Sequence, residues 1–246
     1  WPNIVNSTAS MRYTTGYALR KGLNFDGAQS VRDKSCVGSI IFRATEAYLN
    51  YMEACYESSG ALDSDAQRYW TAIRDRSKVG NWQTTIDNTD MNIEKQTDWG
   101  AYSAGKLVDA TLFNIRRERR CELMAEGFRA ADVRRWRSMD QMIDTPYHVL
   151  GVNVWENLAA NPDFLAANGN NLKEGENISP KDFSTYCAPY HILSNNRVYE
   201  GYRWRMAHYL DPIAVQHFLI TGGGSADNST LYQNPGWPLQ AGQGAE

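Results

Sequence analysis

The sequence predicts an all-α fold in which helix hairpins are joined by long irregular loops and short β pieces. Two observations carry this prediction. Apolar residues recur at three- and four-residue steps in two pairs of neighbouring segments, and a short turn separates the members of each pair. In contrast, the stretch 139–205 shows no convincing helical periodicity. With 246 residues, the chain can bury a substantial core in one large domain or two modest ones.

The first predicted hairpin spans about 39–78. Its first helix covers 39–58, and Gly60 is expected to end it because glycine adopts the left-handed conformation at low cost. The second helix covers 65–78. Ser64 is its expected N-cap, and Gln67, three residues later, completes a capping box. The short connection between the two helices predicts an αα-hairpin.

The second predicted hairpin spans about 106–138 and begins with a long helix that includes the charged stretch discussed below. The segment between the hairpins, 79–104, is polar and rich in turn residues. After the second hairpin comes the irregular region 139–205. The C-terminal segment 206–246 opens with a pattern that predicts a short strand followed by a short helix.

Composition excludes several functions. The formal net charge of −3 gives no general attraction to nucleic acid, so no nucleic-acid partner is expected. No run of about 18 apolar residues is present that would span a membrane. Aromatic residues make up 12% of the chain, with 8 Trp and 14 Tyr, and many lie among Gly, Asn and Asp in expected loops. Rings on loops are suited to the flat apolar faces of sugars.

The stretch 115–136 contains seven arginines, three glutamates and one aspartate. Glu118, Glu122 and Glu126 are four residues apart and would repel one another on an isolated helix. We expect arginines of the same helix or the next one to neutralise them, because the planar guanidinium pairs bidentately with carboxylates. The expected members of this structural ion network are Glu118, Arg119, Glu122, Glu126, Arg129 and Arg135.

Two other interpretations of this stretch are weaker. A phosphate or nucleic-acid site would not interrupt its arginines with carboxylates. A glycosidase needs two carboxyl groups about 5 to 10 Å apart across a cleft, with the pKa of one of them raised. Surrounding arginines would lower the pKa of these glutamates instead.

Other chemical signatures are absent from the sequence. It contains no GxSxG, HExxH or P-loop motif, and no GxGxxG motif follows a predicted strand. The four histidines are scattered and lack the spacing of metal ligands. The sequence therefore predicts no catalytic residue, no metal site and no cofactor, and the chain is not expected to be an enzyme.

The charged stretch resembles the signature I-x-x-E-R-x-x-E-L-x-x-E-G-x-R-x-x-D-L-x-R-W of the SusD/RagB family of nutrient-binding lipoproteins of Bacteroidetes. The matching residues are Ile115, Glu118, Arg119, Glu122, Leu123, Glu126, Gly127, Arg129, Asp132, Arg135 and Trp136, with Val133 replacing the usual leucine. The first helix resembles the family segment I-x-x-R-x-A-E-x-x-L-x-Y-x-E-A through Ile40, Arg43, Glu46, Leu49, Tyr51, Glu53 and Ala54. Shorter matches lie at 15–17, 72–76, 209–213 and 233–237, so the resemblance covers nearly the whole chain.

This resemblance implies a scaffold of tetratricopeptide-like helix hairpins decorated by irregular loops. It also implies a protein that is lipid-anchored at the outer-membrane surface through an N-terminal cysteine and acts with a SusC-like TonB-dependent transporter. Family members capture oligosaccharides or polysaccharides, or peptides in some cases, and are not enzymes. They are also about twice as long as this chain. The resemblance therefore implies that this chain is one part of a SusD-like domain and that a missing N-terminal half is its partner.

The leading hypothesis is a cell-surface glycan-binding protein. Trp82, Trp99 and Tyr102 are the candidate ligand-binding residues, because they lie in the polar segment between the two hairpins. Packing of these rings against the helices is an equally open interpretation. Two other functions are carried as alternatives: a helical-repeat scaffold that binds peptide or protein, and an enzyme that acts on polysaccharide.

Overall fold

A computed structural model of the protein describes residues 1–5, 12–29, 31, 33–38 and 40–245. Among these residues the secondary structure is mostly helical, with one two-stranded antiparallel sheet, which confirms the predicted all-α fold. The chain divides into two compact units. We call 1–23 together with 142–204 the loop unit, and 24–141 together with 205–246 the helical unit.

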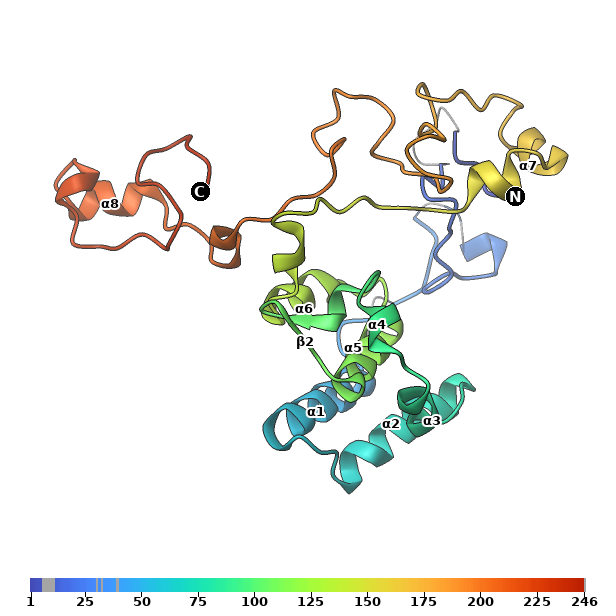
Figure 1. Ribbon diagram of the computed structural model, residues 1–246, viewed down its shortest axis with the longest axis horizontal. Coiled ribbons are helices and arrows are strands. Elements are labelled where there is room, and N and C mark those ends of the chain that lie inside the picture. Colours follow the sequence, from blue (N-terminus) through green and yellow to red (C-terminus); the bar gives the residue numbers. More distant parts are fainter. Residues whose placement is uncertain (6–11, 30, 32, 39, 246) are drawn as a thin grey trace. The chain divides into compact units, whose positions relative to one another are not determined.

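The first hairpin consists of α1 (Ala44–Ser59) and α2 (Ser64–Ser77), which pack against each other (Figure 1). Gly60 ends α1 as predicted, with φ 71° and its N–H donating to the Tyr56 carbonyl at 2.8 Å. The start of α1 was predicted too early. Ser39 lies outside the described residues, and 40–42 are not helical. β-Branched and aromatic side chains at 40–42 lose rotamer freedom in a helix, which disfavours a longer α1.

The N-cap of α2 is Asp63 and not the predicted Ser64. The Asp63 carboxylate accepts a hydrogen bond from the Ala66 N–H at 2.8 Å, while Ser64 is the first helical residue. The predicted capping box is therefore wrong, and the Gln67 amide donates to the Leu62 carbonyl instead. Asp and Ser are both common N-cap residues, so the local sequence alone could not show whether Asp63 or Ser64 caps the helix.

The second hairpin consists of α5 (Ala110–Glu122) and α6 (Arg129–Arg135), and both are shorter than predicted. The residues expected to start α5 form a β-hairpin, in which β2 (Lys106–Leu107) pairs with β1 (Tyr102–Ser103). Asp109 then caps α5 by accepting from two backbone N–H groups, at 2.8 and 3.0 Å. A turn with Ala125 at φ 63° and Gly127 at φ 86° follows α5.

The segment between the hairpins, which is polar and rich in turn residues, contains short helices that were not predicted from the sequence. These are α3 (Trp82–Asp87), α4 (Met91–Glu94) and the 3-10 helix η3 (Trp99–Ala101). Each follows an Asn or Asp that caps it, at Asn81, Asp90 and Asp98. The capping residues were visible in the sequence, but the helices are too short for periodicity to reveal them.

The core of the helical unit lies where α1, α2, α3 and α5 meet. Trp70 is fully buried and stacks on Trp82, with ring centroids 5.0 Å apart and planes 9° apart. Its indole N–H donates to Glu118 of α5 at 3.0 Å, so one side chain joins the apolar core to the charged stretch. The buried members of this core are Leu49, Met52, Ala66, Trp70, Ile73, Trp82, Ile115 and Leu123.

The loop unit contains the π-helix η5 (Val154–Leu158) and α7 (Pro162–Ala167), with most of its chain irregular. Val154, Phe164 and Ile178 form its small core. The N-terminal segment joins it through backbone hydrogen bonds, including one from Val152 N–H to the Thr15 carbonyl at 2.8 Å. Irregular backbone is held here by tertiary hydrogen bonds and not by a helix or sheet ladder.

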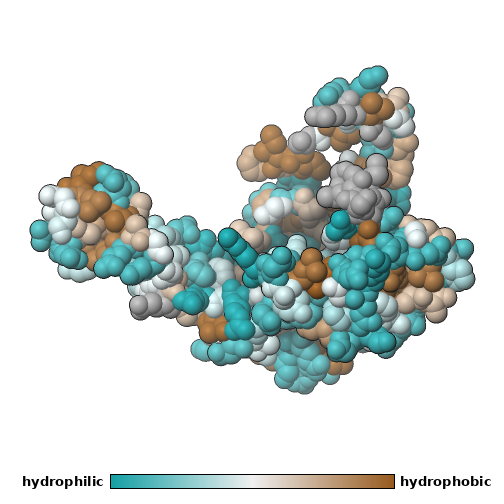
Figure 2. Space-filling view, turned by 90° about the horizontal axis from the view of Figure 1, so that it is seen from above, coloured by the Kyte–Doolittle hydropathy of each residue, from teal (hydrophilic) through white to brown (hydrophobic). Residues whose placement is uncertain are grey.

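The C-terminal segment contains the 3-10 helices η6 (Met206–Tyr209) and η7 (Ala226–Asn228), with α8 (Val215–Thr221) between them. The strand predicted at its start is therefore wrong. Figure 2 shows hydrophobic residues gathered on the lobe around α8, where Ile220 is 67% exposed. Two further 3-10 turns, η2 (Gly27–Gln29) and η4 (Met139–Met142), complete the described elements.

Replacing Trp70 with alanine tests the core. Loss of the buried ring and of its hydrogen bond to Glu118 is expected to lower the free energy of unfolding by about 3 to 5 kcal/mol. Urea unfolding measures the change. Arg68→Ala on the exposed side of the same helix is the control, with an expected change of less than about 1 kcal/mol. Equal effects of the two substitutions would contradict the proposed core.

Candidate ligand-binding site

Arginines from the first hairpin bind the carboxylates of the charged stretch. Arg43, immediately before α1, donates to Glu122 at 2.7 Å and to Glu126 at 2.9 Å. Arg76 of α2 donates to the other oxygen of Glu122 at 2.6 Å, and Arg74 donates to Glu118 at 3.0 Å. Three carboxylates at the α5 end of the second hairpin are thus paired with three arginines of the first.

This pairing differs from the expectation that arginines of the same helix or the next one would neutralise the glutamates. Arg119 instead donates to Asp132 of α6 at 2.7 Å, and Arg120 contacts Asp98. Neighbouring positions on a helix point in different directions, so the face that carries Glu118 and Glu122 meets α2 while Arg119 and Arg120 meet other elements. Glu126 also lies beyond the end of α5, in the turn, and not on the helical face where it was expected.

A second set of ion pairs joins α6 to α1. Arg135 donates to both oxygens of Glu53, at 2.8 and 2.6 Å, and to Asp132 at 3.0 Å. Glu53 also accepts from the Trp136 indole, although its side chain is only 5% exposed. A carboxylate this deeply buried is tolerated because a bidentate guanidinium and an indole N–H satisfy its oxygens.

The three rings expected to bind ligand are in different environments. Trp82 is only 9% exposed, stacks on Trp70 and donates to the Thr71 hydroxyl at 3.2 Å. Trp82 is therefore a core residue, and of the two interpretations left open by the sequence, packing against the helices is the one that fits it. Trp99 and Tyr102 are partly exposed and lie three residues apart on the η3–β1 segment. The structure therefore places two of the three candidates on one segment and the third in the core.

The loop unit contains an aromatic cluster that the sequence did not single out. Phe183 stacks on His191 with ring centroids 3.6 Å apart, and His191 stacks on Tyr199 at 4.0 Å. His148 meets Phe183 at 4.8 Å with ring planes 65° apart. A hydrogen-bond contact of 2.8 Å between His191 Nδ1 and the Tyr199 carbonyl fixes the central ring. These four rings come from separate loops and form one group, which we call the ring cluster.

A second group of rings adjoins the ring cluster in sequence. Tyr190 meets Tyr202 edge to face, with centroids 5.9 Å apart. Tyr202 in turn pairs with Tyr147 through two backbone hydrogen bonds, of 2.8 and 2.9 Å. Each of the three side chains is about 40% exposed. The sequence does show that the irregular region 139–205, which contains both groups, is rich in aromatic residues. It does not show which rings contact one another, because that depends on the folded structure.

A polar pocket of about 540 Å³ is built by the same segment of the loop unit. Pro189, Ile192 and Leu193 supply apolar walls to the pocket, while Tyr190 and His191, which stand between them in the sequence, are not part of its lining. Three asparagines add amides that both donate and accept, and the lining also includes one arginine as a donor and one glutamate as an acceptor. The lining residues are Val5, Arg12, Glu176, Asn177, Pro189, Ile192, Leu193, Asn195 and Asn196.

One histidine of the ring cluster has a shifted pKa. Burial lowers the pKa of His148, and the neighbouring His191 lowers it further, which favours the uncharged form. The described residues contain no group of three or more His, Cys, Asp or Glu side chains that could hold a metal ion. None of the helices that they form is both long and apolar enough to cross a membrane.

Comparison with known families identifies the chain. The family model of the SusD family matches residues 5–237. The chain belongs to the SusD family. Comparison with curated proteins and with solved structures gives no significant match. Members of the SusD family are binding proteins and not enzymes, and are generally associated with the outer membrane, so family membership indicates a nutrient- or glycan-binding role.

The ion pairs of Glu122 predict a dependence of stability on pH. Burial acts to raise the pKa of Glu122, but hydrogen bonds from Arg76 and Arg43 outweigh it and leave the pKa below the ordinary value of 4.5. A lowered pKa in the folded state adds stability above about pH 4.5, and this stability is lost as the pH falls through the folded-state value. Unfolding free energy should therefore decrease on acidification below about pH 4.5.

Glu122→Gln removes this contribution. At pH 7 we expect a loss of roughly 1.5 to 3 kcal/mol, because the substitution removes the charged acceptor that Arg43 and Arg76 share, while Arg43 keeps its ion pair with Glu126. The variant should also lose part of the acid dependence that the wild type shows in urea unfolding measured at a series of pH values. Asp65→Asn, at an exposed ion pair on α2, is the control and should change neither quantity by more than about 1 kcal/mol. An unchanged acid profile would show that Glu122 does not carry the effect.

Proposed function

We propose that this SusD family protein is the cell-surface glycan-binding component of a polysaccharide uptake system. In this proposal it is lipid-anchored at the outer membrane and delivers oligosaccharides to a SusC-like TonB-dependent transporter. The observation that supports the glycan part is that the loop unit contains the ring cluster, the exposed pair Tyr190 and Tyr202, and a polar pocket whose lining residues Pro189 and Ile192 flank Tyr190 and His191 in sequence.

The chemistry of a sugar fits this arrangement. A pyranose ring has an apolar face of C–H groups and an edge of hydroxyls, so it needs both a flat ring and hydrogen-bonding side chains. Phe183, Tyr190 and Tyr202 offer partly exposed rings, and Asn195 offers an amide that donates and accepts. Each aromatic contact contributes about 0.5 to 1.5 kcal/mol beyond the area buried. Several contacts together would give useful affinity without any catalytic group.

Trp99 and Tyr102 are proposed as a second ligand contact, in the helical unit. Both rings are partly exposed, and the segment that carries them is fixed from behind. The Tyr102 carbonyl accepts from the Ser138 hydroxyl at 2.9 Å, and the Trp99 carbonyl accepts from the Gln141 amide at 3.2 Å. A fixed backbone lowers the entropy lost when a ring is ordered against a ligand.

The arginine–carboxylate network is assigned a structural role in this proposal. Glu53, Glu118 and Glu122 each accept from at least one guanidinium. Burial acts to raise the pKa of Glu122, but hydrogen bonds from Arg76 and Arg43 leave it below its ordinary value, whereas a general acid needs a raised pKa. This engagement is the reason that we do not favour an enzyme acting on polysaccharide.

A peptide- or protein-binding scaffold is the second candidate. Exposed apolar residues immediately before α1 favour it, with Ile41 78% and Phe42 85% exposed. A pair of exposed large apolar side chains of this kind is typical of a surface that meets another protein. This function would require Phe42 and not the ring cluster.

The glycan proposal predicts the behaviour of a double variant, Phe183→Ala with Tyr190→Ala. On an array of oligosaccharides from plant, fungal and host polysaccharides, the wild type should bind at least one class of glycan. Calorimetry with that glycan should show an affinity about tenfold lower for the variant, from the loss of two ring contacts. The melting temperature should change little, because both side chains are partly exposed.

Tyr232→Ala is the matched control, since that ring is 90% exposed in the helical unit and lies outside the ring cluster. It should bind as the wild type does. A wild type that binds no glycan but binds a peptide library, with binding lost in Phe42→Ala, would replace the glycan proposal with the scaffold.

A further inference from the structure

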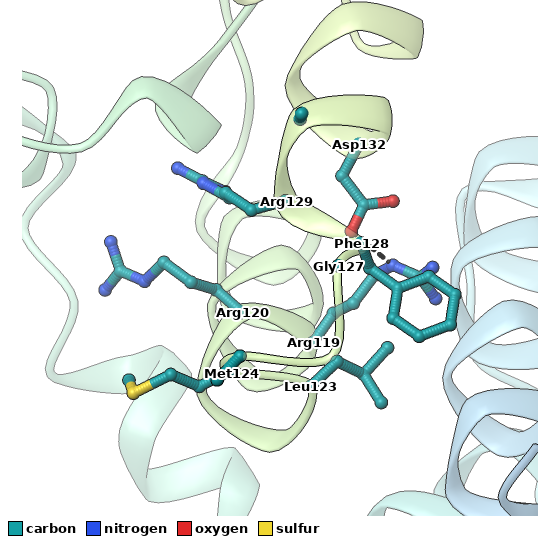
Figure 3. A pocket seen from close by; sticks show the side chains of 10 residues that line it. Arg119, Arg120, Leu123, Met124, Gly127, Phe128, Arg129 and Asp132 are labelled. Atoms are coloured by element: carbon teal, nitrogen blue, oxygen red, sulfur yellow. Dashed lines mark hydrogen bonds and ion pairs between the residues drawn. The ribbon is translucent and has the colours of Figure 1, made fainter. Parts of the chain in front are cut away.

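A pocket of about 400 Å³ lies between the end of α5 and the start of α6. Figure 3 shows Arg120, Arg129 and Met124 on one side of it, and Arg119, Leu123 and Phe128 on the other. The lining thus combines guanidinium groups with apolar side chains. Its residues are Arg119, Arg120, Leu123, Met124, Ala125, Gly127, Phe128, Arg129, Ala130 and Asp132.

The arginines of this pocket differ in how many hydrogen-bond and ion-pair partners they have. Arg119 is buried and bound by Asp132 at 2.7 Å and by Asn50 at 2.7 Å. Arg120 and Arg129, in contrast, share the single carboxylate of Asp98, and the Arg129 contact is long, at 3.4 Å. In the described part of the chain, Asp98 is the one carboxylate within ion-pair distance of either guanidinium.

Two guanidinium groups beside one carboxylate leave one net positive charge. Each guanidinium has five N–H donors, so the pair keeps several donors beyond those that contact Asp98. The Asp98 side chain is 7% exposed, whereas those of Arg120 and Arg129 are 37% and 39% exposed. Both arginines are therefore open to a ligand while the carboxylate that they share is covered.

The electrostatics favour a second anion at this position. Burial lowers the pKa of Arg129, the charge of Asp98 acts in the opposite direction, and the charge of Arg120 lowers the pKa further. A bound anion would offset both the burial and the repulsion. The turn that forms one wall also holds Ala125 at φ 63°, a conformation that costs free energy for a residue other than glycine.

We infer that this pocket binds the carboxylate of a small organic anion, between the guanidinium groups of Arg120 and Arg129. The planar fork of arginine matches a carboxylate, and one net positive charge suits a monoanion better than a doubly charged phosphate. Met124, which is 55% exposed, offers an adaptable apolar contact for the rest of the ligand. This inference concerns the helical unit and does not depend on glycan binding by the ring cluster.

Two matched pairs of probes test the inference by calorimetry at low salt. The first pair is 3-phenylpropionate and its neutral amide, and the second is glucuronate and glucose. Each carboxylate is expected to bind better than its uncharged counterpart, and its affinity should fall with added sodium chloride. Binding by glucuronate alone would identify an acidic sugar as the source of the carboxylate. Binding by 3-phenylpropionate alone would identify an apolar organic acid.

Substitutions then assign the site. Arg120→Gln and Arg129→Gln should each weaken carboxylate binding by about tenfold, because each removes a charged donor. Asp98→Asn keeps an oxygen for the Gly100 N–H but removes the competing charge, so it should strengthen binding. Arg68→Gln, at an exposed pair on α2, should have no effect.

Circular dichroism checks that each variant is folded. If Asp98→Asn does not fold, the inference is tested by carboxylate binding to Arg120→Gln and Arg129→Gln alone. Equal binding of a carboxylate and its amide, no binding of either carboxylate, or full binding by folded Arg120→Gln and Arg129→Gln would overturn the inference.

Discussion

Arg43 is the residue on which the arrangement of the helical unit depends. Its guanidinium joins the start of α1 to Glu122, Glu126 and the Glu122 carbonyl at the end of α5, over distances of 2.7 to 2.9 Å. Burial acts to lower the pKa of Arg43, but the hydrogen bonds to Glu122 and Glu126 outweigh this and raise it. A charge held this way fixes the distance between helices, because any separation would leave a partly buried ion without its partners.

The two units are stabilised by different interactions. In the helical unit, buried ion pairs and the stacked Trp70 and Trp82 constrain α1, α2 and α5 against one another. The loop unit has a small core and places its rings on irregular segments held by tertiary hydrogen bonds. Binding residues often lie on loops, and the proposed glycan contacts of the ring cluster lie in this unit.

Local sequence pattern predicted the helices of the two hairpins, but it did not predict their exact ends, the short helices between them or the sites. The stripe along α1 and the stop at Gly60 are short-range features, and periodicity predicted them. The partners of Glu118 and Glu122 could not be predicted in this way, since Arg74 and Arg43 lie 44 and 79 residues away in sequence. The ring cluster is harder still, because its members lie on separate loops without any period. Trp82 was chosen as a ligand contact because its neighbours are polar, yet tertiary packing buries it.

The most direct test of this account is a double-mutant cycle on Arg43 and Glu122, measured as free energy of unfolding. Arg43→Gln, Glu122→Gln and the double variant should give a coupling of more than about 1 kcal/mol, as found for residues within one ion-pair network. The same cycle on the exposed pair Arg68 and Asp65 should give about 0.3 to 0.5 kcal/mol. Additive effects at Arg43 and Glu122 would contradict the account, since the two side chains would then stabilise the helices independently.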